Sequence, residues 1–264
     1  MGFSFGSYVP KESFVHKLDP RAKLLLGCLF IVALLCSRSA GGLLIAALFV
    51  LVAYLIARIP LRRAMQSLAP LMLIVVLVAV LNLFTAQGGE ILLDGGFLRV
   101  TQAGVETAAF VGVRLTIMML GMSLVTLTTP TIDLSEAFEA LFRPLARFGF
   151  PAHELGMIMG IALRFMPQFA TELDVVRHAQ ASRGARLGSS PVRGMRALSA
   201  LMVPLFASVF RHAETLSAAM DARCYHGGSD RTHLKPLRFT GRDAQAACAV
   251  AFLLVAIVAA NMFA

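Results

Sequence analysis

Runs of apolar residues separated by short polar breaks fill the first half of the chain. Four such runs cover residues 22–36, 43–57, 68–86 and 105–128, and a fifth covers residues 242–264. Because a helix needs about 20 apolar residues to span a bilayer, the first two runs must include flanking positions or lie tilted. The pattern predicts an all-α integral membrane protein with about five transmembrane helices, within a range of four to six.

A different pattern occupies residues 131–149, where apolar side chains recur at spacings of three and four. This periodicity gives one apolar face, which is typical of an amphipathic helix. We expect the helix to lie at the membrane interface. Thr131 or Asp133 can cap its start, and Phe150-Pro151 ends it.

Two long helical patterns fill residues 154–226, separated by a break at Gly184–Pro191. Each pattern begins apolar, contains one proline, becomes polar and ends in an arginine between small residues. The segment is therefore a loose internal duplication. The two ends, which we predict to be docking tips, are Ser182-Arg183-Gly184 and Ala222-Arg223-Cys224.

The arginines at these ends are the candidate functional groups. A cation in the last turn also complements the helix dipole, and a glycine after it forms a left-handed cap, so each end alone has an ordinary structural explanation. The repetition favours docking, because a guanidinium can pair with a carboxylate or cap a partner's helix. A basic face on anionic lipid is an alternative that is compatible with docking.

Each long helix also contains one internal proline, Pro167 in the first and Pro204 in the second. A proline inside a helix removes a backbone hydrogen bond and bends the helix. We therefore predict both prolines as hinges where the helices leave the bilayer.

The composition supports a membrane protein, with 58% hydrophobic and 15% charged residues. A soluble domain is nearer one quarter charged. The net charge of +9 could indicate nucleic acid, but no aromatic-basic module accompanies it. Membrane proteins collect Lys and Arg in cytoplasmic loops, so we expect the bilayer as a partner and no nucleic acid.

Charge also predicts the orientation. The basic residues 1–23 and Arg58–Arg63 face the cytoplasm, whereas the acidic residues 87–106 face outward. The N-terminus is then cytoplasmic, and a single last span places the C-terminus outside unless the long helices also enter the bilayer. We expect a transmembrane region over residues 1–129, a cytoplasmic or interfacial region over 130–241, and a transmembrane helix over 242–264.

Residues that could carry chemistry are few. The four cysteines lack the paired spacing of disulfides or zinc sites. No lysine follows a glycine, so the chain has no P-loop for a nucleotide. We expect no catalytic site, no metal site and no cofactor. Arg114 lies within a predicted span, which makes it either an interhelical partner or a functional group.

The sequence resembles the transmembrane (T) component of energy-coupling factor (ECF) transporters, the EcfT/CbiQ-like family of uptake systems for vitamins and for cobalt or nickel ions. The resemblance covers essentially the whole chain. It rests on Gly6-Ser7-Tyr8-Val9-Pro10, on Leu18-Asp19-Pro20-Arg21-Ala22-Lys23, and on the arginine motifs at residues 180–185 and 219–225.

The resemblance implies a non-catalytic coupling subunit in the inner (plasma) membrane. Its long helices would be coupling helices, and each arginine motif would enter a groove on one of two ABC-type ATPase subunits. The helices would also hold a substrate-binding membrane protein, the S component, and transmit ATP-driven motion to it. Arg183 and Arg223 carry over as the docking residues.

Two positions depart from the family pattern. Ser182 replaces an alanine, and Cys224 replaces a glycine. If Cys224 requires a positive φ, the cysteine is strained. Either the second helix continues through Cys224 into Tyr225, or its cap lies at Gly227-Gly228. We expect the second arrangement.

A self-contained secondary carrier or channel is the alternative function. It would need ionisable groups buried at mid-membrane, and Arg114 is the one candidate. The transported substrate is not encoded in this chain, because the resemblance assigns specificity to the S component. Whether one or several S components share the protein is equally outside the sequence.

Overall fold

The computed structural model describes residues 8–85, 88, 91–94, 99–184, 191–227 and 237–262. The structure is helical apart from one short hairpin, which confirms the all-α membrane class. The elements in order are α1 (Pro20–Cys36), α2 (Ala40–Ala57), α3 (Leu61–Thr85), β1 (Ile91–Asp94), β2 (Arg99–Thr101), α4 (Gln102–Thr128), α5 (Thr131–Phe142), the 3-10 helix η1 (Arg143–Phe148), α6 (Ala152–Ser182), α7 (Pro191–Ala222) and α8 (Gly241–Met262).

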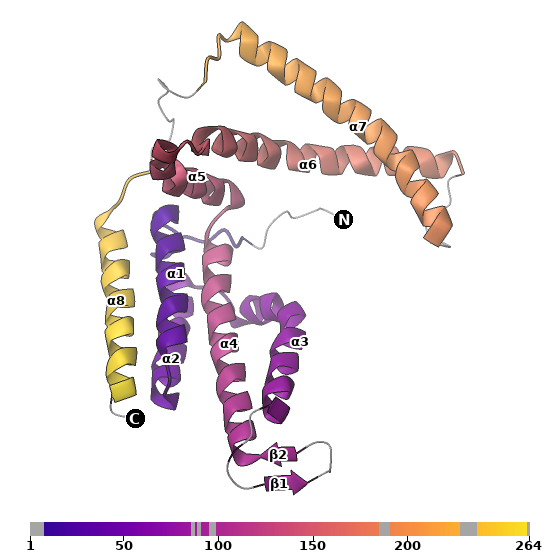
Figure 1. Cartoon of the computed structure of the whole chain (residues 1–264). Helices are drawn as coiled ribbons and strands as arrows, with labels where there is room; N and C mark the ends of the chain where they lie inside the picture. The colour runs from indigo at the N-terminus through magenta and orange to yellow at the C-terminus, as the bar shows by residue number, and fades with distance from the viewer. Residues whose placement is uncertain are drawn as a thin grey trace. The chain divides into compact units, whose positions relative to one another are not determined.

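These elements form two compact units. One contains α1 to α4, the hairpin, most of α5 and α8, and we call it the span unit. The other contains the end of α5, η1, α6 and α7, and we call it the crossing unit. Within the span unit, α1, α2, α4 and α8 run side by side (Figure 1).

The start of α1 is fixed by local chemistry. Asp19 is the N-cap, its carboxylate accepts a hydrogen bond from the Arg21 backbone N–H at 2.9 Å, and Pro20 is the first helical residue. Both features follow from ordinary capping preferences.

A buried polar junction joins this cap to two other helices. Asp243, in the first turn of α8, accepts from the Asp19 backbone N–H at 2.8 Å and from the Thr240 backbone N–H at 2.7 Å. The Lys23 ammonium donates to the Thr128 carbonyl, at the end of α4, at 3.0 Å. Lys23, Asp19 and Asp243 are all buried. Burying a charge is costly unless hydrogen bonds replace its water, and here backbone groups supply those bonds to both Lys23 and Asp243.

Four helices among the described residues are long and apolar enough to cross a bilayer: α2, residues 68–85 of α3, α4 and α8. With 17 residues, α1 is about 26 Å long, slightly less than a bilayer core. Large apolar side chains on α2 and α3 are exposed, including Leu44 at 70% and Leu73 at 77%. Such a surface requires lipid or a protein partner, so the protein is a multi-pass membrane protein.

Close packing of α1 on α4 depends on a glycine. A Cβ atom at Gly121 of α4 would overlap the ring of Phe30 on α1. The Phe30 ring cannot easily give way, because the residue is buried and its ring stacks on Phe49 at 6.2 Å. Small residues at helix contacts are typical of membrane proteins, where close backbone approach replaces hydrophobic collapse.

A second polar cluster holds the opposite end of α1. The Asn261 amide, near the end of α8, donates to the Cys36 carbonyl at 2.8 Å, and its oxygen accepts from the Arg38 backbone N–H at 2.9 Å. Arg114 of α4 donates to the Ser37 carbonyl, and its guanidinium lies 4.6 Å from the Phe110 ring centre. Of the two roles considered for Arg114, the structure supports that of interhelical partner.

The loop predicted over residues 87–106 is more structured than the sequence indicated. β1 and β2 pair antiparallel with a bulge, and α4 begins at Gln102, capped by the Thr101 hydroxyl. α3 also begins earlier than predicted, at Leu61, and is visibly bent (Figure 1). Pro70 lies inside α3, and a proline is the usual cause of such a bend.

The amphipathic helix predicted over residues 131–149 is shorter, which corrects its expected end. α5 stops at Phe142, and the chain continues as η1 to Phe148. Pro144 explains the change, because a proline has no backbone N–H and clashes with the preceding turn of an α-helix. Gly149 then ends η1 with a φ of 84°.

We predict that Gly121→Ala destabilises the protein by about 1–3 kcal/mol, the usual cost of overpacking, because the new methyl group has no space beside Phe30. Thermal unfolding in detergent measures the effect. Gly112→Ala on the same helix is the control, since its Cβ would lie an ordinary 3.8 Å from Ala79. Equal melting temperatures for Gly121→Ala and the wild type would contradict the prediction.

Candidate functional site

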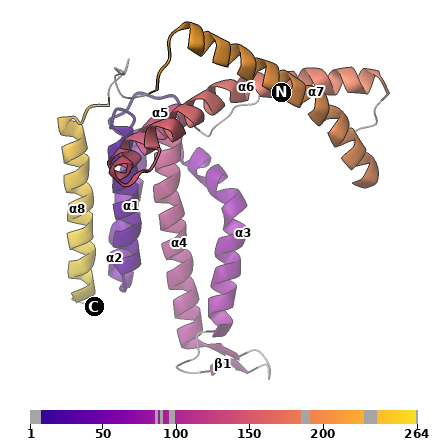
Figure 2. The ribbon, with the colours of Figure 1, turned by 45° about the horizontal axis from the view of Figure 1, so that its top comes forward.

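The candidate site is formed by the two longest helices, α6 with 31 residues and α7 with 32. Both continue through their internal prolines, Pro167 and Pro204, without a break. The two helices cross each other in both views of the crossing unit (Figures 1 and 2). The hinge role of the prolines stays a prediction.

The first arginine end has a glycine cap. Arg183 follows the last helical residue of α6, and its backbone N–H donates to the Ala179 carbonyl at 3.2 Å. Gly184 then takes a left-handed conformation with a φ of 84°, and its N–H donates to the Ala181 carbonyl at 2.9 Å. This bond satisfies a carbonyl that the helix itself leaves free.

The second arginine end has the same cap, with a cysteine in place of the glycine. α7 ends at Ala222, and Cys224 has a φ of 53°. The Cys224 N–H donates to the Asp221 carbonyl at 2.9 Å, and the Tyr225 N–H donates to the Met220 carbonyl at 3.1 Å. This pair of bonds is the Schellman motif, which ends many helices.

This geometry overturns the predicted end of α7. The cap lies at Cys224 and not at Gly227-Gly228, and the helix does not continue into Tyr225 either. Residue preference alone misleads here, because a cysteine rarely takes a left-handed conformation. The duplication was the better signal: Arg183 and Arg223 are 40 residues apart, so Cys224 corresponds to Gly184.

Both arginine ends are open to a partner. Arg183, Arg223 and Cys224 are exposed. Within the described residues, no hydrogen bond or ion pair engages either guanidinium. The Ser182 hydroxyl, by contrast, donates to the His178 carbonyl one turn earlier at 3.0 Å. The serine therefore keeps its polar group within its own helix, and its replacement of alanine leaves the tip unchanged.

A polar cluster that the sequence analysis did not identify lies where α6 and α7 cross. His212 Nε2 lies 2.6 Å from Glu172 Oε1, and the Ser208 hydroxyl donates to Glu172 Oε2 at 2.8 Å. Gln168 Nε2 is 3.1 Å from His212 Nε2. Because the shorter contact is with a carboxylate, we assign His212 Nε2 as the N–H donor to Glu172, which leaves the Gln168 amide nitrogen as a neighbour of this N–H and not as its hydrogen-bond donor.

Hydrogen bonding shifts the pKa of Glu172. The bond from His212, followed by that from Ser208, holds the pKa of this carboxyl below its ordinary value. A lowered pKa favours the ionised form in the folded protein, so its stabilising effect is complete above the ordinary carboxyl range. It is lost as the pH falls through the lowered pKa of Glu172.

Further contacts hold the starts of these helices. Within the crossing unit, His153 of α6 lies 3.0 Å from the Glu139 carboxylate of α5. A Cβ at Gly156 would overlap the same carboxylate, so the glycine allows this close approach. Beyond the end of α7, the Tyr225 hydroxyl lies 2.8 Å from the sulfur of Met157 on α6.

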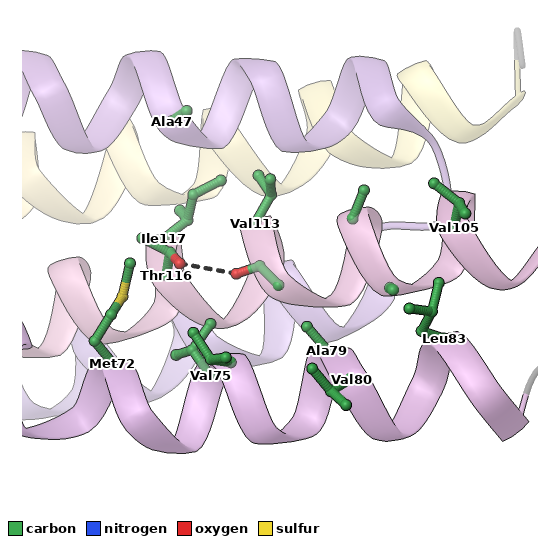
Figure 3. Close-up of a pocket in the computed structure, with 14 residues that line it drawn as sticks. Ala47, Met72, Val75, Ala79, Val80, Leu83, Val105, Val113, Thr116 and Ile117 are labelled. Atoms are coloured by element: carbon green, nitrogen blue, oxygen red, sulfur yellow. Dashed lines mark hydrogen bonds between the residues drawn. The ribbon is translucent and has the colours of Figure 1, made fainter. Parts of the chain in front are cut away.

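The described residues offer no evident metal site, and the groove between α3 and α4 is apolar. No group of three His, Cys, Asp or Glu among them is arranged to hold a metal ion. A groove of about 600 Å³ in the span unit is lined by α3 and α4 with Ala47 of α2, and its lining is almost entirely apolar (Figure 3). Its one hydroxyl, Thr116, donates to the Gly112 carbonyl at 2.8 Å. The groove therefore suits hydrocarbon.

Comparison with known proteins identifies related sequences. The family described as cobalt transport protein (CbiQ) matches residues 11–234. The energy-coupling factor transporter transmembrane protein EcfT of Clostridium kluyveri is 40% identical over 258 residues, covering 97% of this chain and 96% of that protein. The EcfT proteins of Thermosediminibacter oceani and Bacillus subtilis are 41% and 36% identical, over 96% and 90% of this chain and 95% and 90% of their own lengths.

We predict opposite effects for exchanging the two cap residues. Gly184→Ala places a methyl group at a φ of 84° and destabilises the end of α6, whereas Cys224→Gly relieves strain at the end of α7. Each change amounts to about 1 kcal/mol. Hydrogen exchange of the last helical turn measures both, with faster exchange in the first variant and slower exchange in the second. A shift of the same sign at both ends would show that the two caps are not equivalent.

Proposed function

Since this chain belongs to the CbiQ and EcfT family of energy-coupling factor transporter transmembrane proteins, we propose that it is the coupling subunit of an ATP-driven uptake transporter. Two ABC-type ATPase subunits supply the energy. A separate S component binds the substrate, a vitamin or a transition-metal ion. The chain itself hydrolyses no ATP and passes motion between these partners through α6 and α7.

The two arginine ends carry the proposal. Each presents an exposed arginine directly before a residue in the left-handed conformation. A guanidinium has five donors in a fixed plane, which suits a carboxylate or the free carbonyls at the end of a partner's helix. Two such ends match two ATPase subunits, one for each tip.

Apolar side chains on the long helices support the second interaction. Exposed residues recur at helical spacing on α6 and again on α7, so each helix has an apolar face. On α6 they include Leu155, Ile158, Met159 and Met166, and on α7 they include Val203, Phe206 and Phe210. Exposed apolar faces indicate contact with a membrane or a membrane protein. We assign them to the S component.

The positions of the charges support a cytoplasmic location for the tips in the inner (plasma) membrane. Residues 130–241 contain most of the arginines that follow the fourth span, and Lys and Arg concentrate on the cytoplasmic side of membrane proteins. This assigns residues 130–241 to the cytoplasmic side, where ATP is available, and residues 1–129 and 242–264 to the membrane.

The double variant Arg183→Glu with Arg223→Glu tests the docking. We expect both ATPase subunits to be lost from pull-downs, because each tip then presents the opposite charge, while the variant still accumulates in the membrane. Arg177→Glu with Arg211→Glu, which makes the same charge change elsewhere on α6 and α7, is the matched control and retains both ATPases. Wild-type recovery of both ATPases with the tip variant would refute docking through the arginines.

A second experiment tests the source of the energy. We expect the purified chain alone to hydrolyse no ATP, because its sequence has no P-loop to hold a nucleotide's phosphates. Phosphate release is measured with the chain alone and with its ATPase partners. Robust hydrolysis by the chain without partners, resistant to further purification, would exclude a purely coupling role.

A further inference from the structure

We propose that Glu172 and His212 are the positioning residues of the crossing, and that their bond sets the register of α6 against α7 and thereby the separation of the two arginine tips. This inference rests on the proposed function for its purpose. Its structural content, a register set by this polar pair at the crossing, stands on the contacts alone, and the one contact that we describe between these segments away from the crossing, Tyr225 with Met157, lies beyond the end of α7.

The first observation is a hidden symmetry in the cluster. Glu172 precedes Arg183 by 11 residues, and His212 precedes Arg223 by the same number. Gln168 and Ser208 each lie 15 residues before the same arginines. The four polar side chains at the crossing therefore occupy two pairs of equivalent positions in the duplicated helices.

The contacts obey this equivalence. Exchanging equivalent positions of α6 and α7 turns the contact of Gln168 with His212 into that of Ser208 with Glu172, and both contacts are present. The same exchange turns the contact between Glu172 and His212 into itself. This pair is therefore the central contact of the cluster.

The pair lies at the same distance along each helix from the arginine at its end, and we call these two stretches, residues 172–183 and 212–223, the arms. At 1.5 Å per residue, 11 helical residues place each arginine about 16 Å along its helix from the pair. Both internal prolines, at 167 and 204, precede the pair, so no proline interrupts either arm. Each arm is therefore an uninterrupted helical stretch, and a shift in the register of α6 against α7 at the pair moves both tips.

The chemistry of the pair suits a register device. Two long helices that touch at one crossing can slide by a turn if their contact is purely apolar, because neighbouring apolar side chains are similar. A polar pair in a partly buried place penalises every register that leaves it unpaired. The side chains are 33% exposed for His212 and 25% for Glu172. The His212 ring also stacks on Phe165 and lies tilted against Phe169.

Spin labels report the tip separation directly. Residues 179 and 219 are exposed alanines four positions before each arginine, and a ketone-bearing unnatural amino acid at each accepts a label without disturbing the native cysteines. Their backbones lie at most about 30 Å apart if the helices cross at the pair. We expect one narrow distance population in the full-length chain, and its loss to a broad or shifted distribution in Glu172→Gln and in His212→Gln.

The exchange variant Glu172→His with His212→Glu provides the decisive comparison. Because the two positions are equivalent, it re-forms the pair with its members reversed and restores the narrow population at least in part. Glu214→Gln and His178→Gln make the same chemical changes away from the pair and leave the distances unchanged. Ser208→Ala, a milder change that removes one hydrogen bond to Glu172, broadens the distribution less than Glu172→Gln.

Two outcomes would overturn the inference: unchanged distances in both single variants, or an exchange variant no narrower than the single variants. The measurement is made first on the chain alone and then on the chain with its ATPase partners. Failure of the arginine pull-down would remove the proposed function without altering the distances in the chain alone. The two ideas therefore fail separately.

With the partners present, we also expect ATP hydrolysis to persist in Glu172→Gln while ATP-driven uptake falls.

Discussion

The crossing of α6 and α7 is the constraint on which the candidate site depends. Helices of 31 and 32 residues that cross at an angle pack closely over a short part of their lengths (Figure 1), so burial alone determines their relative register poorly. The bond between Glu172 and His212 favours one register over its neighbours, which apolar packing does not do. The helix caps then determine where α6 and α7 end, and Arg183 and Arg223 are the residues directly after those ends.

Local signals in the sequence predicted the features that depend on neighbouring residues. Asp19 and Pro20 start α1 in the way that capping preferences indicate, because a cap requires a few adjacent groups. The family and the membrane class were equally accessible, since apolar runs and the arginine motifs are visible in the sequence. The hairpin was missed because β1 and β2 are short and lie among glycines, where apolar periodicity gives no signal.

Features that depend on distant partners could not be predicted in this way. Nothing near Glu172 distinguishes it from the other polar residues of α6, and the crossing brings it to a histidine 40 residues away. Cys224 shows the opposite case, in which a poor residue for a left-handed cap takes it because the two bonds of the motif outweigh the strain. In both cases comparison of the two halves of the duplication carries information that residue preference does not.

The buried junction at Lys23 has a mechanical consequence. Lys23 binds the carbonyl of Thr128, where α4 ends, and Asp243 binds the backbone N–H of Thr240, just before α8. Asp243 also holds the cap of α1. The two ends of the segment between α4 and α8 are thus both hydrogen-bonded to the same buried junction at the start of α1. A displacement of either anchor point therefore acts on hydrogen bonds that join α1, α4 and α8.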